Sequence, residues 1–279
     1  MSNDSERPYF MIKYIYIDSH TRKGKKMTRT KKINVTIWNE ENENPEHQPA
    51  YPEGIHNAIA AFLKNDEQIE TLRTATLSQP HHGLPPEVLN DTDVLLWWGH
   101  VHHDLVADDI VENVRQRVLA GMGLIVLHSA HASKIFSALL GTNTRQLRWR
   151  ENNELERVWI INHTHPITAG VGEYIDIPES ETYGEYFNIP APDELISISW
   201  YSGGEVFRSG CTFQRGFGKI FYFSPGHESY RIYDMPQIQR VIKNAIGWAA
   251  PAAYPDIAFN EHKKTPQELY KENLTKAQK

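Results

Sequence analysis

The sequence predicts an α/β protein built on a mostly parallel sheet with helices on both faces. Between residues 33 and 140, short apolar runs rich in β-branched residues alternate with amphipathic helical segments. Strands that alternate with helices form right-handed βαβ units, and the resulting parallel sheet is covered on both faces. The chain has 279 residues, which suits one domain with a full core.

The first half of the chain carries four such repeats of strand and helix. The strands are expected at 33–38, 68–72, 93–98 and 123–127, and the helices at 52–63, 85–89, 108–120 and 132–140. Pro52 suits the first turn of a helix, because its ring holds φ near the helical value. Gly121 and Gly141 stand at predicted helix ends, where glycine accepts a left-handed conformation.

The second half predicts strands with fewer helices between them. Strands are expected at 157–161, 195–200, 206–212 and 219–223, with a hairpin turn at 201–205 and a last helix at 236–249. The chain therefore divides into a basic N-terminal extension at 1–32, an α/β domain at 33–251 and a C-terminal tail at 252–279, in which a helix starts at Pro266.

The charge distribution restricts the partners of the fold. Residues 1–32 hold nine lysines and arginines against three acids, whereas the remaining residues hold 20 against 32. An acidic body repels phosphate backbones, so we expect no nucleic-acid partner for the fold. No apolar run approaches the roughly 18 residues that span a bilayer, so we expect no membrane partner. A homo-oligomer is compatible with the sequence.

Two further features of the sequence concern location and cofactors. Cys211 is the single cysteine, which excludes an intramolecular disulfide and favours the cytoplasm. It lies inside a predicted strand, where a thiol has a structural role. No glycine-rich phosphate loop follows the first strand, so no nucleotide cofactor is expected.

Histidines follow three of the predicted strands. Windows 99–104, 128–131 and 226–228 hold six of the 14 histidines of the chain. Ligands of open parallel sheets bind at the carboxyl ends of strands, so we expect these side chains to meet. Imidazoles with a carboxylate suit a divalent transition metal, zinc first. The predicted metal ligands are His100, His103, His128, His131, Glu185 and His227.

Four other residues are candidates for proton transfer or nucleophilic attack. Glu181 and Tyr183 alternate in an extended segment and therefore share one face. Ser129 stands between a strand and a helix, where a nucleophile is presented. Glu228 follows the last of the strand-end histidines. A carboxylate or a phenol beside a metal is well suited to move protons.

Four segments together resemble the ThuA-like family of trehalose and related disaccharide utilisation. They are residues 97–104, 121–131, 181–187 and 222–228, and the resemblance spans about 33–251. It implies a three-layer sandwich like that of class I glutamine amidotransferases. In that superfamily a cysteine occupies the elbow where this chain has His128 and Ser129. The resemblance thus implies a pocket at the same place with a chemistry that uses no thiolate.

Three functions agree with these residues, and each takes a small-molecule carbohydrate as partner. The first is a metal-dependent hydrolase, lyase or isomerase that acts on a sugar or an oxidised disaccharide. The second is a non-catalytic sugar-binding or regulatory protein that uses the same pocket. The third is a hydrolase in which Ser129 is the nucleophile and His227 its base. All depend on His100, His128 and His227 lying close together.

Overall fold

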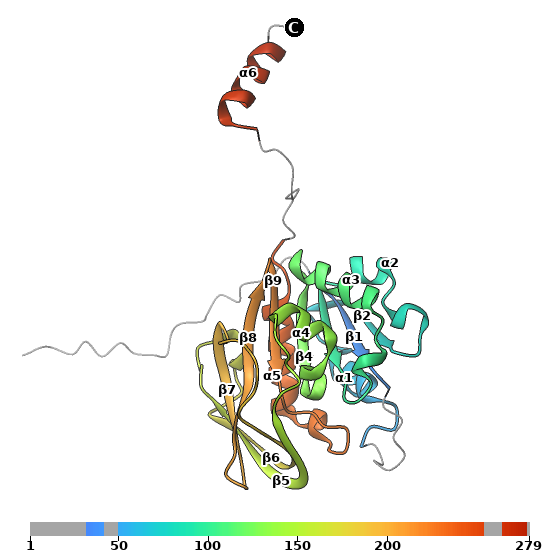
Figure 1. Ribbon diagram of the computed structural model, residues 1–279, viewed down its shortest axis with the longest axis vertical. Helices are drawn as coiled ribbons and strands as arrows, with labels where there is room; N and C mark the ends of the chain where they lie inside the picture. The colour runs from blue at the N-terminus through green and yellow to red at the C-terminus, as the bar shows by residue number, and fades with distance from the viewer. Residues whose placement is uncertain (1–31, 42–49, 254–263, 278–279) are drawn as a thin grey trace, which may run out of the picture. The chain divides into compact units, whose positions relative to one another are not determined.

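A computed structural model describes residues 32–41, 50–253 and 264–277. Within these residues nine strands form one sheet in the order β2-β1-β3-β4-β9-β8-β7-β5-β6 (Figure 1). The strands are β1 (Ile33–Asn39), β2 (Ile69–Thr76), β3 (Val94–Trp98), β4 (Gly123–Leu127), β5 (Arg148–Ile160), β6 (Tyr174–Gly184), β7 (Glu194–Tyr201), β8 (Val206–Arg215) and β9 (Gly218–Phe223). The α-helices are α1 (Ile55–Leu63), α2 (Pro86–Asn90), α3 (Asp108–Leu119), α4 (Lys134–Leu140), α5 (Pro236–Ala249) and α6 (Pro266–Ala277).

The sheet is mixed, and the two halves of the chain build its two kinds of pairing. β2, β1, β3, β4 and β9 pair in parallel, while β9, β8, β7, β5 and β6 pair antiparallel. The α/β class is confirmed. The expectation of a mostly parallel sheet is wrong, because hairpins such as β7–β8 replace βαβ crossovers in the second half. The amidotransferase-like sandwich stays a prediction.

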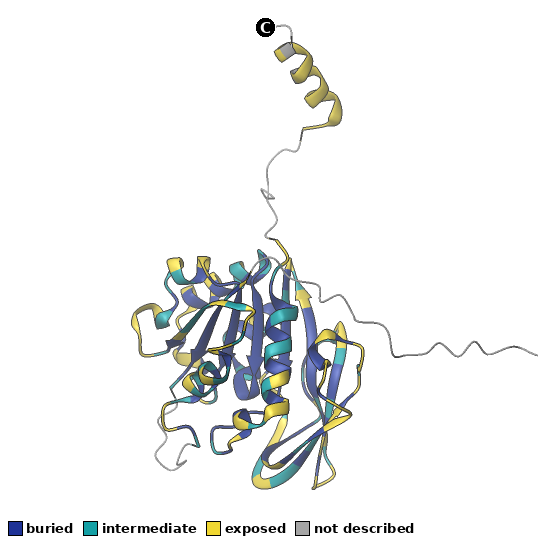
Figure 2. Cartoon of the chain, turned by 180° about the vertical axis from the view of Figure 1, so that it is seen from behind, coloured by how far each residue is buried: buried dark blue, intermediate teal, exposed yellow. Residues whose placement is uncertain are grey.

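The parallel strands are buried between two layers of helices. Along β3, Val94, Leu96 and Trp98 join one core, and Leu95 and Trp97 join the other, because successive side chains point to opposite faces. Helices α1 and α5 pack on the first core, and α2, α3 and α4 on the second. Figure 2 shows these central strands in dark blue among the helices.

Strand β5 is where the structure departs most from the predicted elements. It begins at Arg148, whereas the sequence predicts a strand only from residue 157. Residues 148–155 are all exposed or half-buried, so they lack the apolar alternation that reveals a strand. Their partner is β6, and Trp149 stands opposite Tyr183 in the register. The extension of β5 brings new residues to the predicted site.

The ends of the chain are described in part. Helix α6 starts at Pro266, as predicted. The basic extension at 1–32 lies outside the described residues except for Lys32, and residues 254–263 and 278–279 of the predicted tail also lie outside them. No described helix combines the length and the hydropathy that crossing a membrane requires.

Candidate active site

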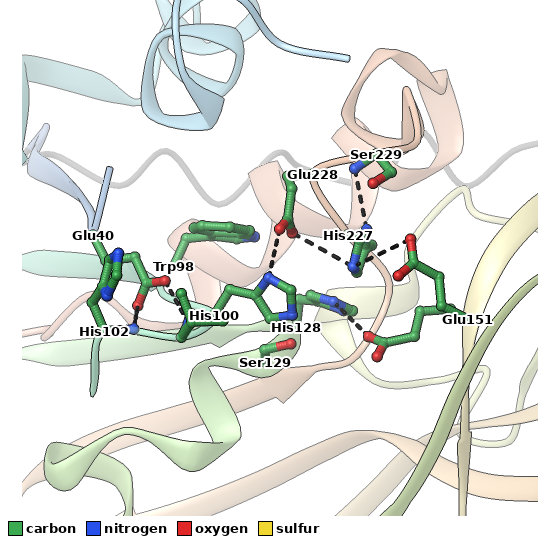
Figure 3. A network of polar contacts seen from close by, with 12 residues as sticks. Glu40, Trp98, His100, His102, His128, Ser129, Glu151, His227, Glu228 and Ser229 are labelled. Atoms are coloured by element: carbon green, nitrogen blue, oxygen red, sulfur yellow. Dashed lines mark hydrogen bonds and ion pairs between the residues drawn. The ribbon is translucent and has the colours of Figure 1, made fainter. Parts of the chain in front are cut away.

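Three histidines lie at the carboxyl ends of three adjacent strands (Figure 3). His100 follows β3, His128 follows β4 and His227 follows β9, and β4 pairs with both other strands. The ring centroids of His100 and His227 are 5.0 Å apart, and those of His128 and His227 are 5.2 Å apart. The rings of His100 and His128 are 6.1 Å apart. The three imidazoles thus meet at one edge of the sheet, as expected from the sequence.

Two backbone features place these rings. His128 has a φ of 52°, a left-handed conformation that is rare for a residue with a side chain and common at functional turns. Gly226, just before His227, has a φ of 140°, and a Cβ there would lie 2.1 Å from the hydroxyl oxygen of Tyr233. The indole N–H of Trp98 donates to the Gly226 carbonyl at 3.0 Å. Only glycine fits this position beside Tyr233. The hydrogen bond from Trp98, the last residue of β3, holds the loop before His227 against that strand.

Glu228 supports His100. Its Oε1 lies 2.5 Å from Nδ1 of His100. Burial raises the pKa of Glu228, but the hydrogen bond to His100 and the nearby imidazoles lower it more, to about 2. Burial lowers the pKa of His100, but Glu228 raises it more, so the net shift is upward. Glu228 thus binds Nδ1 of His100, so a metal ion bound by this ring would be held through Nε2.

His128 and Glu181 form a contact that calls for a cation. Nδ1–H of His128 donates to the Ser224 carbonyl at 2.8 Å, so Nε2 of the neutral ring carries a lone pair. That Nε2 lies 3.1 Å from Oε2 of Glu181. This oxygen is buried and makes no hydrogen bond of acceptable geometry with any described residue. A lone pair and a carboxylate oxygen this close repel unless a proton or a metal ion lies between them.

Tyr183 and Ser129 extend this contact towards solvent. The Tyr183 hydroxyl lies 3.3 Å from Nε2 of His128 and 2.6 Å from the Ser129 hydroxyl. Burial raises the pKa of Tyr183 well above its usual value, so the phenol keeps its proton near neutral pH. The Ser129 hydroxyl, in the turn after β4, bonds to Tyr183, and the pairing of Ser129 with His227 stays a prediction.

His227 is held in one tautomer by its own loop. The backbone N–H of Ser229 donates to Nδ1 of His227 at 3.1 Å, so the neutral ring carries its proton on Nε2. This Nε2 lies 3.7 Å from Oε2 of Glu228 and 3.9 Å from Oε1 of Glu151. Burial lowers the pKa of His227 to about 4, which keeps the ring neutral near pH 7. His227 therefore presents an N–H group between two carboxylates.

Two carboxylates of the site were missed by the sequence analysis. Glu40 follows β1, and its buried carboxylate accepts hydrogen bonds from the N–H groups of Val101 at 2.6 Å and His102 at 3.1 Å. Glu40 thereby fixes the loop that carries His100. Its position directly after a predicted strand is the feature of the sequence that would have identified it as a site residue. Glu151 lies in the polar part of β5, where no pattern in the sequence predicts a strand.

Three predicted metal ligands lie outside the group that surrounds Glu181. The Glu185 carboxylate pairs with Arg208 at 2.8 Å and accepts from the Phe187 N–H, because the chain turns after β6 and no longer alternates. His103 lies in the short helix after the His100 loop, and its Nδ1 is 3.9 Å from Oε2 of Glu40. His131 is bound at Nδ1 to the Thr144 carbonyl at 3.0 Å. Burial lowers the pKa of His103 to about 4 and that of His131 to about 3.

A cavity of about 400 Å³ opens onto part of this site. Its polar wall includes His100, Ser129, Glu181 and Tyr183, and its outer wall includes Trp149. This volume lies at the lower end of the range of about 300–1,000 Å³ that is common for ligand pockets. The site therefore has room for one small polar ligand in contact with the histidine and glutamate side chains.

Comparison with known protein families matches residues 34–249 to ThuA, described as trehalose utilisation. The chain belongs to the ThuA family. The resemblance that the sequence motifs indicate is thus confirmed over nearly the whole α/β domain. A search of curated proteins finds no match to this ThuA family chain.

Solved structures share the fold of this ThuA family chain. A ThuA-like protein of Parabacteroides merdae superposes with a TM-score of 0.61 at 12% identity, over 84% of this chain and 95% of that one. A ThuA-like protein of Bacteroides uniformis gives 0.55 at 16% identity, over 77% and 90%. A protein of Salmonella typhimurium described as cytoplasmic gives 0.55 at 13% identity, over 78% and 100%. At these identities the likeness shows the fold alone.

Three residues of this ThuA family chain are placed to bind a metal ion, and two of them could do so without any change in their hydrogen bonds. One ligand-type atom from each of His100, Glu181 and His227 lies within 4.8 Å of the others. His100 has Nδ1 occupied by a carboxylate, the usual support of a metal-bound imidazole. Glu181 offers a buried oxygen without a hydrogen bond. His227 fits through Nε2 once the Ser229 N–H bond to Nδ1 is given up, because a ligating nitrogen cannot carry a proton.

Proposed function

We propose that this protein is a metal-dependent enzyme that acts on a sugar or an oxidised disaccharide. The metal is a divalent transition ion, zinc first, held by His100, Glu181 and His227. One observation carries the proposal: one ligand atom from each of these three residues lies within 4.8 Å of the others, and His100 and Glu181 also line a cavity of about 400 Å³. The family description of trehalose utilisation supports a carbohydrate as the ligand.

The residues around the three metal ligands have different roles in the proposed reaction. A bound ion supplies Lewis-acid polarisation of a sugar oxygen. Glu228 orients His100 through the 2.5 Å contact at Nδ1. His128 is the proton acceptor: a proton taken up at Ser129 passes through Tyr183 to Nε2 of His128, where it lies beside Oε2 of Glu181, 3.1 Å away, and removes the repulsion in that contact. Ser129 is the outermost member of this relay and lines the cavity.

A cytoplasmic location fits the same proposal. One buried cysteine in 279 residues requires no oxidising compartment. The Salmonella neighbour with the same fold is described as cytoplasmic. We assign the protein to the cytoplasm on these grounds.

The test compares two glutamates that stand four residues apart. Untagged wild type, Glu181→Gln and Glu185→Gln are loaded with zinc, dialysed, and analysed for metal by mass spectrometry. We expect about one equivalent in wild type and Glu185→Gln, because Glu185 is engaged by Arg208. We expect less than a tenth of an equivalent in Glu181→Gln, because metal affinity depends on the ionised ligand. Equal zinc in all three proteins would contradict the metal site.

Turnover is tested separately from metal binding. Trehalose and an oxidised, keto form of it are incubated with the zinc-loaded enzyme and followed by NMR. Conversion by wild type and not by Glu181→Gln supports the enzyme. Saturable binding of sugar without conversion by any zinc-, manganese- or nickel-loaded sample would instead indicate a sugar-binding protein and refute the proposed catalysis.

A further inference from the structure

The antiparallel end of the sheet turns one face to solvent. Strands β7, β5 and β6 lie side by side at this end (Figure 1). Val158 of β5 and Ile175 of β6 stand opposite each other in the register, and both are buried in the core. Their neighbours Trp159 and Tyr174 also stand opposite each other, and they are 36% and 38% exposed. Because successive side chains of a strand point to opposite faces, Trp159 and Tyr174 lie on the outer face.

Six residues form two adjacent rows across this outer face. They are Trp200, Arg157 and Asp176 in the first row, and Ile198, Trp159 and Tyr174 in the second. Residues that stand directly opposite each other in an antiparallel pair lie on the same face, so each row is continuous from β7 through β5 to β6. These six residues are called the outer patch below.

Arg157 joins the two rows of the outer patch. Its Nε and Nη2 donate to the Asp176 carboxylate at 2.6 Å and 2.8 Å. Its guanidinium carbon also lies 4.2 Å from the centroid of the Tyr174 ring and 5.4 Å from that of the Trp159 ring. The ion pair makes the outer patch electrically neutral as a whole. Arginine, tryptophan and tyrosine are also the residue types that are enriched at the centres of protein interfaces.

The exposed apolar area of the outer patch approaches what a dimer interface needs. Trp200 is 39% exposed, and at about 250 Å² for each aromatic side chain the three rings expose about 300 Å². Val206 of β8 stands opposite Trp200 in the register and extends this surface, since it is 51% exposed. A stable interface takes about 800 Å² from each partner, of which about 450 Å² is apolar. The outer patch with Val206 therefore supplies most of the apolar area of one partner.

We propose that the outer patch is the interface of a two-fold symmetric dimer of this chain. In such a dimer the same residues of both copies meet. A two-fold axis that runs between the two rows places Arg157 of each copy on the Trp159 ring of the other copy, and Asp176 beside the Tyr174 hydroxyl. Each charge then meets a ring or a hydroxyl instead of a like charge. This self-complementarity favours a second copy over a partner that carries charge of one sign.

The experiment measures the mass of the full chain in solution. Wild type, Trp200→Glu and Phe217→Glu are compared by sedimentation velocity over a range of protein concentrations. We expect wild type to dimerise and Trp200→Glu to raise the Kd of the dimer at least about 30-fold, because a charge replaces a buried aromatic anchor. Phe217 is 41% exposed and lies after β8, about 30 Å along that strand from Val206. Phe217→Glu is therefore expected to dimerise as wild type does.

A second pair of variants tests the arrangement of the two copies. Arg157→Glu sets a carboxylate against the Trp159 ring of the other copy and is expected to raise the Kd about tenfold or more. Arg157→Lys keeps a cation at this position and is expected to weaken the dimer less. Circular dichroism of all variants checks that the fold is retained.

Four outcomes overturn the proposal. They are a wild type that is monomeric at every concentration, a dimer that Trp200→Glu leaves intact, equal weakening by Phe217→Glu, and equal weakening by Arg157→Glu and Arg157→Lys. The first shows that a second copy does not cover the outer patch, and the second and third place the dimer contact elsewhere. The fourth shows that Arg157 does not meet a ring of the other copy.

Discussion

Replacement of Glu156 by glutamine is expected to change the pH dependence of stability. Glu156 lies in β5 and is 1% exposed, and its carboxylate accepts hydrogen bonds from Ser180 at 2.8 Å, Ser199 at 2.5 Å and Tyr201 at 3.2 Å. It forms no ion pair with a described residue. Burial raises its pKa in spite of the three hydroxyl donors. The folded protein therefore binds this proton more tightly than the unfolded chain does.

The sign of the effect follows from this upward shift. The contribution of Glu156 to the free energy of unfolding is fully present below the unfolded pKa of 4.5 and is lost as the pH rises through the folded pKa. The loss has a maximum slope of about 1.4 kcal/mol per pH unit, the free energy of one proton per pH unit. Glutamine cannot ionise, so Glu156→Gln is expected to gain stability relative to wild type as the pH rises above about 4.5.

Glutamine can satisfy the same network. Its carbonyl oxygen replaces Oε1 and accepts from Ser199 and Tyr201. Its amide donates to the Ser180 hydroxyl, which then donates to the Glu181 carbonyl 3.2 Å away. The fold is therefore expected to survive the substitution with little cost independent of pH.

The assay is urea unfolding of wild type, Glu156→Gln and Glu173→Gln at pH 5, 6, 7 and 8. Glu173→Gln removes the same charge at an exposed position and serves as the control. We expect the stability difference between Glu156→Gln and wild type to grow with pH by more than the difference for Glu173→Gln. A difference that is flat with pH, or that falls, would refute the reasoning that burial governs the ionisation of Glu156.

Two further predictions concern the site. Gly226→Ala is expected to destabilise the fold by about 3 kcal/mol in urea unfolding, because the new Cβ would lie 2.1 Å from Tyr233 at a φ of 140°. Gly170→Ala has a φ of 74° and open space, so it should cost only about 1 kcal/mol, and equal costs would contradict the packing argument. Ser129→Ala is expected to keep its zinc and to lose about 100-fold in kcat, whereas an unchanged kcat would remove Ser129 from the relay.

The predicted elements are most accurate where strands are buried on both faces. The strand at 123–127 has the predicted bounds, and β3 and β1 differ from prediction by one residue each, because Val, Ile, Leu and Trp runs leave no other element that could bury them. The same strand ends then locate His100, His128 and His227, since the topology of a parallel sheet brings them to one edge.

The polar part of β5 and the loop after β6 explain what the sequence does not reveal. Residues 148–155 form a strand because they pair with β6, which is a tertiary interaction that no local pattern encodes. Glu151 and Trp149 were missed for this reason. Glu185 lies outside the group of histidines because alternation ends after Gly184, the last residue of β6, and Arg208 binds its carboxylate. Local alternation cannot show where a strand stops pairing.

Anomalous diffraction at the zinc edge, from crystals of untagged protein grown with zinc, tests the central claim most directly. The account predicts an anomalous peak within about 2.0–2.2 Å of a nitrogen of His100, an oxygen of Glu181 and a nitrogen of His227. It also predicts that Nδ1 of His227 no longer accepts from Ser229 in that crystal. A map without a peak between these three residues, or with zinc only at other histidines, would contradict the claim.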